Sequence, residues 1–445
     1  MTTTIVTPPL DTPSGWRPVS ELTPINTTPI LDADYKWVVI GAGFTGLGAA
    51  RRLGELNPAD TILFLDARPV GWGASGRNSG FVIDLPHKFE LDNPEEKRLK
   101  KIIELNRTAV RELENQINTH NIDCSWSRAG KLQGAVGERG IQMMQKFKSA
   151  LDLIKEPYDI LSPNACLDKT GTEYYSQAVF TSGSALVDPL ALTRGLARHL
   201  PQNVHLNDQT AVTQMCRQDK GYDLTLQSEG EVGTKTILAR NVILAVDPFT
   251  PEFGFLKHRI LPLSTFASIT RPLTASELET FRGTLDWGLT PADPAGTTLR
   301  MTQEGRILLR NQYTISPKYL ADKHLLADVY TKQREGFEKR YPDLDHVPFE
   351  TTWGGVCGIS RNHSAFFGKL ADNVFSASCY NGVGVAKGTI SGMLLADYAS
   401  GHKSQSLQDI KDLSNVPSLI PPEPFRSIGG SVRLKFAEWQ SRTEF

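Results

Sequence analysis

A glycine fingerprint near the N-terminus is the clearest sign of chemistry in this sequence. Gly41, Gly43 and Gly46 form GAGFTG directly after an apolar β-branched run and before a helical pattern. The first glycine permits a tight turn, the second lets a pyrophosphate approach the backbone, and the third lets helix pack on strand. Asp66 closes the next apolar run, where its carboxylate can accept hydrogen bonds from a ribose. This spacing predicts a dinucleotide site in a βαβ unit.

A second glycine-rich loop, GWGASGRNSGF at residues 71–81, follows that unit. Its small residues would let a flat ring edge approach the backbone closely. Ser75, Arg77 and Asn78 can hydrogen-bond a pyrophosphate, ribityl hydroxyls or the edge of a flavin. NAD needs no further loop of this kind, whereas FAD is longer and stays bound, so the loop favours FAD. The alternative interpretation is a solvated surface loop.

The elements that must position these loops alternate between strand and helix. Residues 34–66 form the predicted βαβ unit, and residues 93–118 carry the apolar stripe of a long amphipathic helix. Short strands with Gly and Asp turns are expected over residues 203–246, and a strand of a second sheet over 306–315. Residues 373–401 have the pattern of a strand, a glycine turn and a helix ended by glycine. This alternation predicts an α/β fold.

The length and net charge of the chain limit the classes of function that it can have. A chain of 445 residues exceeds the usual size of one hydrophobic core, so we expect two lobes. The 48 basic and 49 acidic residues leave a formal net charge of -1, which gives no electrostatic case for binding nucleic acid or an anionic membrane. The N-terminus lacks the pattern of a secretory signal, and no apolar run is long enough for a transmembrane segment.

The cysteines point to a reducing compartment. They are odd in number and far apart, and no Cys-x-x-Cys pair occurs, so we expect neither a disulfide framework nor a metal site. These features predict reduced thiols in a cytoplasmic protein. The five cysteines are Cys124, Cys166, Cys216, Cys357 and Cys379.

Four blocks, in the same order along the chain, resemble the D-amino-acid oxidase (DAO) superfamily of FAD-dependent oxidoreductases, with likeness to its γ-glutamylputrescine oxidoreductase branch and related amine and amino-acid oxidases. The blocks are VVIGAGFTGLGAARRL, LDARPVGWGASGRNSG, VILAVDPFTP and CYNGVGVAKGTISGMLLADY. The resemblance covers residues 15–400. It implies a Rossmann-like FAD-binding domain interleaved with an antiparallel-sheet (α+β) substrate domain.

The resemblance also implies where each domain draws its residues. The first 33 residues would be an extended arm, and the last 40 a C-terminal tail. The expected ranges are 1–33 for the arm, 34–90, 180–250 and 350–405 for the FAD-binding domain, 91–179 and 251–349 for the substrate domain, and 406–445 for the tail.

The last block matters for the flavin. In the family, the helix after the sequence NGVG points its N-terminus at the flavin N1–C2=O edge, where backbone N–H groups and the helix dipole stabilise negative charge. With the two loops, this gives the expected FAD-binding residues: Gly41, Ala42, Gly43, Phe44, Thr45, Gly46, Asp66, Ala67, Arg68, Gly73, Ala74, Ser75, Arg77, Asn78, Ser79, Val212, Ala245, Gly382, Val383, Gly384 and Val385.

The implied activity is oxidation of a C–N bond in a small amine or amino-acid-like substrate. A hydride would pass to flavin N5, the imine would hydrolyse, and the electrons would leave to oxygen or another acceptor. We expect no single essential catalytic side chain, with Tyr380 and His363 as pocket candidates. Two alternatives stay open: FAD-dependent oxidation of a hydroxy acid or polyol, and a non-catalytic flavoprotein that serves as an assembly factor.

The chain departs from the family pattern at two places. Asp247 follows Ala245 and Val246 where relatives commonly carry Thr and Asn or Gly, and residues 360–363 (SRNH) replace the usual pattern after Trp-Gly-Gly. Cys357 lies near the position where sarcosine-oxidase-like relatives attach FAD through sulfur. The motif around it is poor, so the expected FAD is non-covalent.

Overall fold

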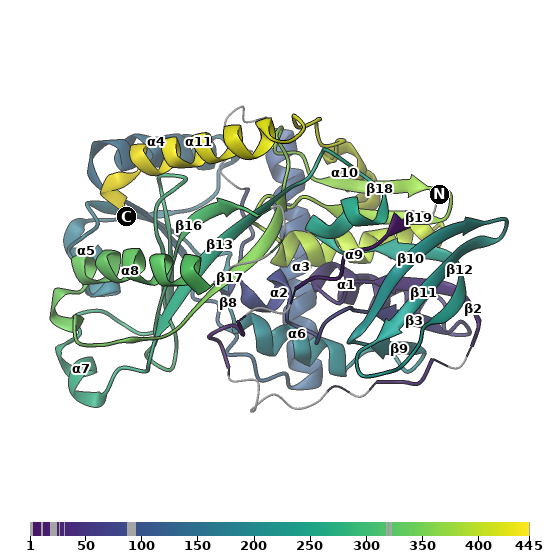
Figure 1. Cartoon of the computed structure of the whole chain (residues 1–445). Helices are drawn as coiled ribbons and strands as arrows, with labels where there is room; N and C mark the ends of the chain where they lie inside the picture. The colour runs from purple at the N-terminus through teal and green to yellow at the C-terminus, as the bar shows by residue number, and fades with distance from the viewer. Residues whose placement is uncertain are drawn as a thin grey trace.

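Two large sheets organise the molecule, which is described here from a computed structural model. The structure describes residues 3–9, 12–17, 25, 27–30, 32–86, 95–316, 319 and 323–444. Figure 1 shows two lobes, one built around each sheet, with the long helix α3 (Glu96–His120) between them. Strands and helices are mixed in both lobes, which confirms the predicted α/β fold class.

The first sheet has nine strands and holds the predicted βαβ unit. Its central strands are parallel and buried on both faces, as the apolar runs of the sequence predict. The strand order is β1 (Thr3–Thr4), β10 (Thr210–Gln218), β11 (Gly221–Ser228), β12 (Lys235–Leu244), β2 (Asp34–Ile40), β3 (Ile62–Leu65) and β9 (Val204–Asn207), with β19 (Val374–Ser378) on β12 and β18 (Phe366–Ala371) on β19.

The second sheet has eight strands, and all but one of its pairings are antiparallel. Helices α8 (Lys323–Arg340), α4 (Gly137–Ile154) and α11 (Phe425–Gln440) lie around it, and the short helices α5 (Pro163–Thr170) and α7 (Ala275–Thr280) lie at its end (Figure 1). The strand order is β17 (Phe349–Ile359), β13 (Leu261–Thr270), β16 (Ile307–Ile315), β15 (Thr298–Met301), β14 (Trp287–Pro291), β5 (Lys131–Ala135), β7 (Gln177–Thr181) and β6 (Asp159–Leu161).

A two-stranded ribbon joins the lobes. It pairs β4 (Phe81–Val82), directly after the second glycine loop, with β8 (Ala185–Leu186). Helix α6 (Pro189–Arg198) follows β8 and begins with a proline. The carboxylate of Asp188 caps this helix, because it accepts hydrogen bonds from the N–H groups of Leu190 and Ala191.

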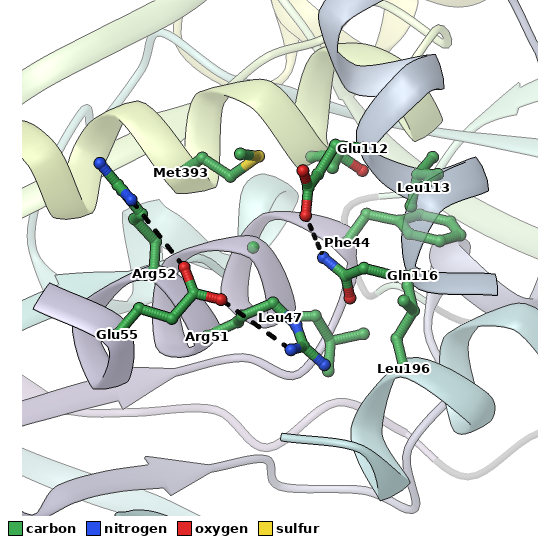
Figure 2. Close-up of a pocket in the computed structure, with 12 residues that line it drawn as sticks. Phe44, Leu47, Arg51, Arg52, Glu55, Glu112, Leu113, Gln116, Leu196 and Met393 are labelled. Carbon is green, nitrogen blue, oxygen red and sulfur yellow. Dashed lines mark hydrogen bonds and ion pairs between the residues drawn. The ribbon is translucent and has the colours of Figure 1, made fainter. Parts of the chain in front are cut away.

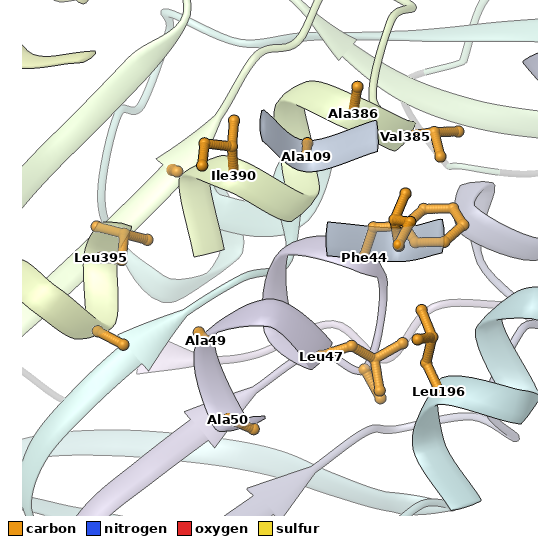
Figure 3. Packing of buried hydrophobic residues seen from close by; sticks show 14 of the residues in the cluster. Phe44, Leu47, Ala49, Ala50, Ala109, Leu196, Val385, Ala386, Ile390 and Leu395 are labelled. Carbon is orange, nitrogen blue, oxygen red and sulfur yellow. The ribbon is translucent and has the colours of Figure 1, made fainter. Parts of the chain in front are cut away.

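Two glycines bring α1 (Phe44–Leu56) and α9 (Val385–Ala399) into close contact. A Cβ on Gly392 would lie 1.9 Å from the carbonyl oxygen of Thr45, and one on Gly48 would lie 2.7 Å from that of Thr389. Figure 3 shows side chains from α1, α6 and α9, among them Phe44 and Leu196, gathered in one cluster. This contact fixes the N-termini of α1 and α9 relative to each other.

The ends of the chain are partly built into the lobes. In the predicted arm, β1 pairs with β10, and the side chains of Ile5 and Trp16 are buried. The predicted tail contains α10 (Gln405–Leu413) and α11. Strand β17 begins at Phe349, so the predicted boundary at residue 350 falls at the start of a strand of the second sheet. Parts of the arm, and residues 87–90 at the end of one predicted segment, lie outside the described residues.

Candidate active site

The first glycine loop has the geometry that its sequence predicts. Gly41 adopts φ +101°, and a Cβ there would lie 2.5 Å from the carbonyl oxygen of Ala245. A Cβ on Gly46 would lie 1.8 Å from the carbonyl oxygen of Gly41, so only glycine fits. Helix α1 then begins at Phe44, with Gly43 as a cap that has no side chain. The helix start therefore presents backbone donors to an anion such as a pyrophosphate.

Asp66 lies where β3 ends and faces this loop. One carboxylate oxygen accepts a hydrogen bond from the N–H of Ala42 at 2.6 Å, and the other accepts from the N–H of Arg68 at 2.9 Å. Loss of solvation raises the pKa of Asp66 to about 6. Its backbone carbonyl accepts from the N–H of Thr210 at the start of β10, which brings that strand to the same corner.

The second glycine loop folds into one helical turn, α2 (Ala74–Arg77), and touches the first loop. The hydroxyl of Ser75 accepts a hydrogen bond from the N–H of Phe44 at 3.0 Å. A Cβ on Gly76 would lie 2.1 Å from the carbonyl oxygen of Gly71, whereas a Cβ on Gly73 would meet no protein atom within 4 Å. The loop thus lies against the N-terminus of α1 and leaves free space at Gly73.

Arg77 connects the second loop to the other lobe. Its Nε donates to the carbonyl oxygen of Gly354 in β17 at 2.6 Å, and its own carbonyl accepts from the indole N–H of Trp353 at 3.0 Å. Its guanidinium lies 5.8 Å from the ring centre of Trp72. The side chain is buried and links the second loop to the second sheet. This structural role does not depend on a contact between Arg77 and the cofactor.

Asn78 uses its side chain on the loop itself. Its amide nitrogen donates to the carbonyl oxygen of Ser75 at 2.7 Å, and its amide oxygen accepts from the N–H of Gly80 at 2.9 Å. The backbone carbonyl of Asn78 accepts from the indole N–H of Trp16 at 2.8 Å. In this structure, Asn78 shapes the loop, and its predicted contact with the flavin stays a prediction.

The turn before α9 lies beside the first loop. The hydroxyls of Tyr380 and Thr45 lie 2.7 Å apart, which places Tyr380 at the start of α1 and in the buried core. Gly382 adopts φ +87°, and a Cβ there would meet no protein atom within 4 Å. The amide of Asn381 donates to the carbonyl oxygen of His363 at 3.0 Å, so the pocket candidates Tyr380 and His363 both border this turn.

Asp247 joins three segments at this point, although sequence reasoning assigned it no role. One carboxylate oxygen accepts from the N–H of Cys379 at 2.7 Å, and the other accepts from the N–H of Gly358 at 2.9 Å. Loss of solvation raises the pKa of Asp247 to about 6. The only signal in the sequence was an acidic residue where the family pattern has small or neutral ones.

A partly open face of the second sheet lies next to the second loop. In β17, Gly355 pairs with Thr265 of β13, and a Cβ on Gly355 would lie 3.5 Å from Arg77. On the same face, Arg310 of β16 donates to the hydroxyl of Tyr313 at 2.6 Å. It also donates to the hydroxyls of Thr298 and Thr265, at 3.1 and 3.5 Å. Its guanidinium also lies 5.5 Å from the ring centre of Tyr313, so within the described residues all of its partners are uncharged; sequence reasoning did not single it out.

Comparison with known proteins assigns the chain to a family. The FAD-dependent oxidoreductase family, DAO, matches residues 36–398. The chain belongs to this family. It is 26% identical over 386 residues to the probable oxidoreductase OrdL of Haemophilus influenzae, with 82% of each chain covered. It is 23% identical over 373 residues to γ-glutamylputrescine oxidoreductase of Escherichia coli, covering 82% of this chain and 83% of that protein.

Solved structures share the fold. Glycine oxidase from Geobacillus kaustophilus superposes with a TM-score of 0.69 at 16% identity, covering 84% of this chain and 96% of that chain. L-proline dehydrogenase from P. horikoshii gives a TM-score of 0.67 at 16% identity, with the same coverage. The predicted Rossmann-like fold with a second, sheet-based lobe is thereby confirmed. As a member of the DAO family, this protein is an enzyme of the FAD-dependent oxidoreductase class.

The residues present fit FAD. Ordinary side chains would close the glycine turns at Gly41 and Gly46, and free space remains beside Gly73 and Gly382. The N-termini of α1 and α9 supply backbone donors, and the carboxylate of Asp66 supplies a hydrogen-bond acceptor. These features suit a long, anionic dinucleotide held by backbone.

The remaining predicted cofactor residues border the same corner. Ala245 donates its N–H to the carbonyl of Ile40, and Val212 lies in β10 two residues after Thr210. The Nε of Arg68 donates to the carbonyl of Pro8 in the arm at 2.6 Å. Ala42, Thr45, Ala67, Ala74, Ser79, Val383 and Val385 lie in or next to the two loops and the α9 turn; the roles of all these residues in binding FAD stay predictions.

A small cavity lies where α1, α3, α6 and α9 meet. Figure 2 shows its polar wall, where Glu55 lies 3.9 Å from both Arg51 and Arg52, and Gln116 donates to Glu112. Its volume of about 20 Å³ is near that of a single water molecule. Among the residues that the structure describes, no group of His, Cys, Asp and Glu is placed to hold a metal ion, and none of the helices is both long and apolar enough to cross a bilayer.

Proposed function

We propose that this protein oxidises a C–N bond of a small amine that carries a carboxylate, such as an amino acid or an amino-acid-like amine. The observation that carries the proposal is Arg310, a half-buried guanidinium whose partners among the described residues, three hydroxyls and the ring of Tyr313, are all uncharged. A substrate carboxylate would supply the anionic partner in a two-pronged geometry. The names of the relatives, which include glycine oxidase and γ-glutamylputrescine oxidoreductase, support the same substrate class.

The chain's own residues would bind and orient rather than exchange protons. When bound, FAD supplies the hydride acceptor that this chain lacks. Arg310 would fix the carboxylate, while the sheet face and the second loop exclude water from the reacting carbon. The N-terminus of α9 offers N–H groups and a positive dipole end to developing negative charge. Gly41, Gly43, Asp66 and Ser75 would hold the dinucleotide end.

Replacing Arg310 with methionine tests the substrate assignment. Losing a charge-assisted hydrogen bond costs about 1.5–3 kcal/mol, so we expect kcat/KM for amino-acid substrates to fall roughly 10- to 150-fold. Steady-state kinetics of wild type and Arg310→Met measure this. An amine without a carboxylate is the matched control, and its kcat/KM should change little. An equal loss for both kinds of substrate would contradict a carboxylate-binding role.

We also propose that FAD is held without a covalent bond. The thiol of Cys357 donates to the carbonyl oxygen of Leu263 at 3.6 Å. Loss of solvation, with the nearby Asp247 as a second cause, raises the pKa of the Cys357 thiol to about 12. The thiol is therefore protonated at neutral pH and a poor nucleophile.

Acid precipitation measures this directly. We expect the yellow colour to stay in the supernatant for wild type and for Cys357→Ser alike. Colour in the wild-type pellet that disappears in Cys357→Ser would show a covalent attachment at this cysteine.

A reducing, cytoplasmic compartment is the location we propose. All five cysteines are free in the structure, and Cys124, Cys166 and Cys379 are buried. Free thiols of this kind persist where glutathione keeps them reduced.

The electron acceptor is either oxygen or another oxidant. A measurement of oxygen consumption during turnover of the holoenzyme distinguishes the two.

A further inference from the structure

Helix α11 carries an apolar stripe that faces away from the protein. Five large side chains lie three or four residues apart along one side of this 16-residue helix, and none of the helix's residues is buried. They are Phe425 (69% exposed), Ile428 (60%), Val432 (62%), Phe436 (55%) and Trp439 (59%). Exposed apolar surface gathered in this way marks an interaction site.

The opposite side of α11 is attached to the second lobe. A Cβ on Gly430 would lie 3.0 Å from the side chain of Ile315 in β16. After the helix, the carbonyl of Glu444 accepts from Arg340 and from Thr297, both at 2.7 Å. Figure 1 shows α11 along the outer edge of this lobe. The helix is therefore held in place, and its apolar side is presented outward by the fold.

Basic residues flank the stripe. Helix α11 contains Arg426, Arg433 and Lys435 but only one acidic residue, Glu438. Burial raises the pKa of Glu438, and Lys332 and Lys435 are the cations near it. Arg442, just after the helix, lies 5.7 Å from the ring centre of Trp439. Arg426 is paired with Glu423 just before the helix, so the exposed Arg433, Lys435 and Arg442 are the residues that make this surface locally cationic, although the whole chain is nearly neutral.

We propose that the outer face of α11 docks on an anionic lipid bilayer. Aromatic and aliphatic side chains on one side with Lys and Arg beside them are the pattern of a helix that lies in the membrane interface. Anionic lipids face the cytoplasm, where the surface potential attracts basic segments. Each of the five apolar side chains could enter the boundary between headgroups and acyl chains.

A second copy of the chain fits this face less well. A two-fold contact would bring Arg433 and Lys435 of both copies together, and like charges repel. The charge of this face therefore favours an anionic lipid surface.

Docking there would set the orientation of the enzyme. Helix α11 packs on β16, the strand that also carries Arg310 and Tyr313. The partly open sheet face would then lie close to the lipid surface. The docking itself rests only on α11 and is independent of the substrate proposed above.

Vesicle flotation of the full-length holoprotein tests the inference. We expect it to float with phosphatidylcholine vesicles that contain about 30% phosphatidylglycerol, and at least about tenfold less with phosphatidylcholine alone or in about 0.5 M salt. The double variant Val432→Asp/Phe436→Asp should lose at least about tenfold of this binding. Val232→Asp is the matched control, because Val232 is a fully exposed apolar residue elsewhere, in the loop between β11 and β12.

Three results would overturn the inference. Wild type could fail to float with anionic vesicles, or Val232→Asp could lose binding as much as the double variant. Sedimentation could instead reveal a dimer that the double variant dissociates, while vesicles bind neither protein. An unchanged flavin spectrum and melting temperature show that each variant is folded, and because flotation needs no substrate, its outcome is separate from that of the Arg310 kinetics.

Discussion

The Gly73→Val protein is expected to leave a gel-filtration column without FAD. A Cβ on Gly73 meets no protein atom within 4 Å, and the backbone there is extended (φ -77°, ψ -172°), so valine fits the apoprotein. Gly73 is exposed in the apoprotein, so we expect a side chain at this position to clash with the bound cofactor and not with the protein. Overpacking costs about 1–3 kcal/mol, so we expect FAD to bind up to about 100-fold more weakly, with an unchanged melting temperature of the apoprotein.

Two further glycine variants serve as controls. Gly429→Val places the same side chain in open space on α11 and should keep FAD. Gly76→Val should lose FAD and stability together, because its Cβ would lie 2.1 Å from the carbonyl oxygen of Gly71. Flavin fluorescence after gel filtration is the readout. Full FAD content in Gly73→Val would remove the second loop from the cofactor site.

Asp66→Asn should weaken FAD binding and remove its pH dependence. The change replaces a charged acceptor by a neutral one, a loss of about 1.5–3 kcal/mol or roughly 10- to 150-fold in Kd. In wild type, FAD should bind more weakly as pH falls through about 6, because the carboxyl of Asp66 becomes protonated there. Fluorescence titration of apoprotein between pH 5 and pH 8, values that bracket this pKa, measures both effects.

The stability of the apoprotein should change in the opposite direction. The pKa of Asp66 is raised from 3.8 to about 6 on folding, so the folded state holds this proton more tightly than the unfolded chain. This group therefore makes the apoprotein less stable as pH rises from about 4 to about 6, while FAD affinity increases. A Kd of wild type that stays constant between pH 5 and pH 8 would contradict the placement of Asp66 at the cofactor.

Local patterns predicted the parts of the site that depend on backbone shape. The fingerprint around Gly41 and Gly46 and the acid at Asp66 occur within one βαβ unit, where spacing along the chain sets spacing in space. The second loop could also be recognised in the sequence, because a run of small residues of this length is unusual. The contact of Ser75 with the start of α1 could not be predicted, since it depends on how α2 folds.

Long-range pairings were beyond sequence reasoning. Asp247 accepts hydrogen bonds from Gly358 and Cys379, which lie more than a hundred residues away along the chain. No local sequence pattern predicts hydrogen bonds of this range. In the sequence, nothing distinguishes Arg310 from the other arginines. Its position beside several hydroxyl groups results from the pairing of β13 with β16. The cationic face of α11 could not be predicted from the overall charge. Basic and acidic residues along the 445-residue chain nearly cancel, so the net charge of -1 does not report one basic segment.

Anaerobic titration of the purified holoprotein with amines and amino acids tests the central claim most directly. We expect an amine or amino acid with an oxidisable C–N bond to abolish the visible absorption band of the bound flavin in the absence of oxygen. Reduction by hydroxy acids or polyols alone would contradict the proposed substrate class. A band that no amine, amino acid or hydroxy acid changes, although dithionite bleaches it, would contradict catalysis itself.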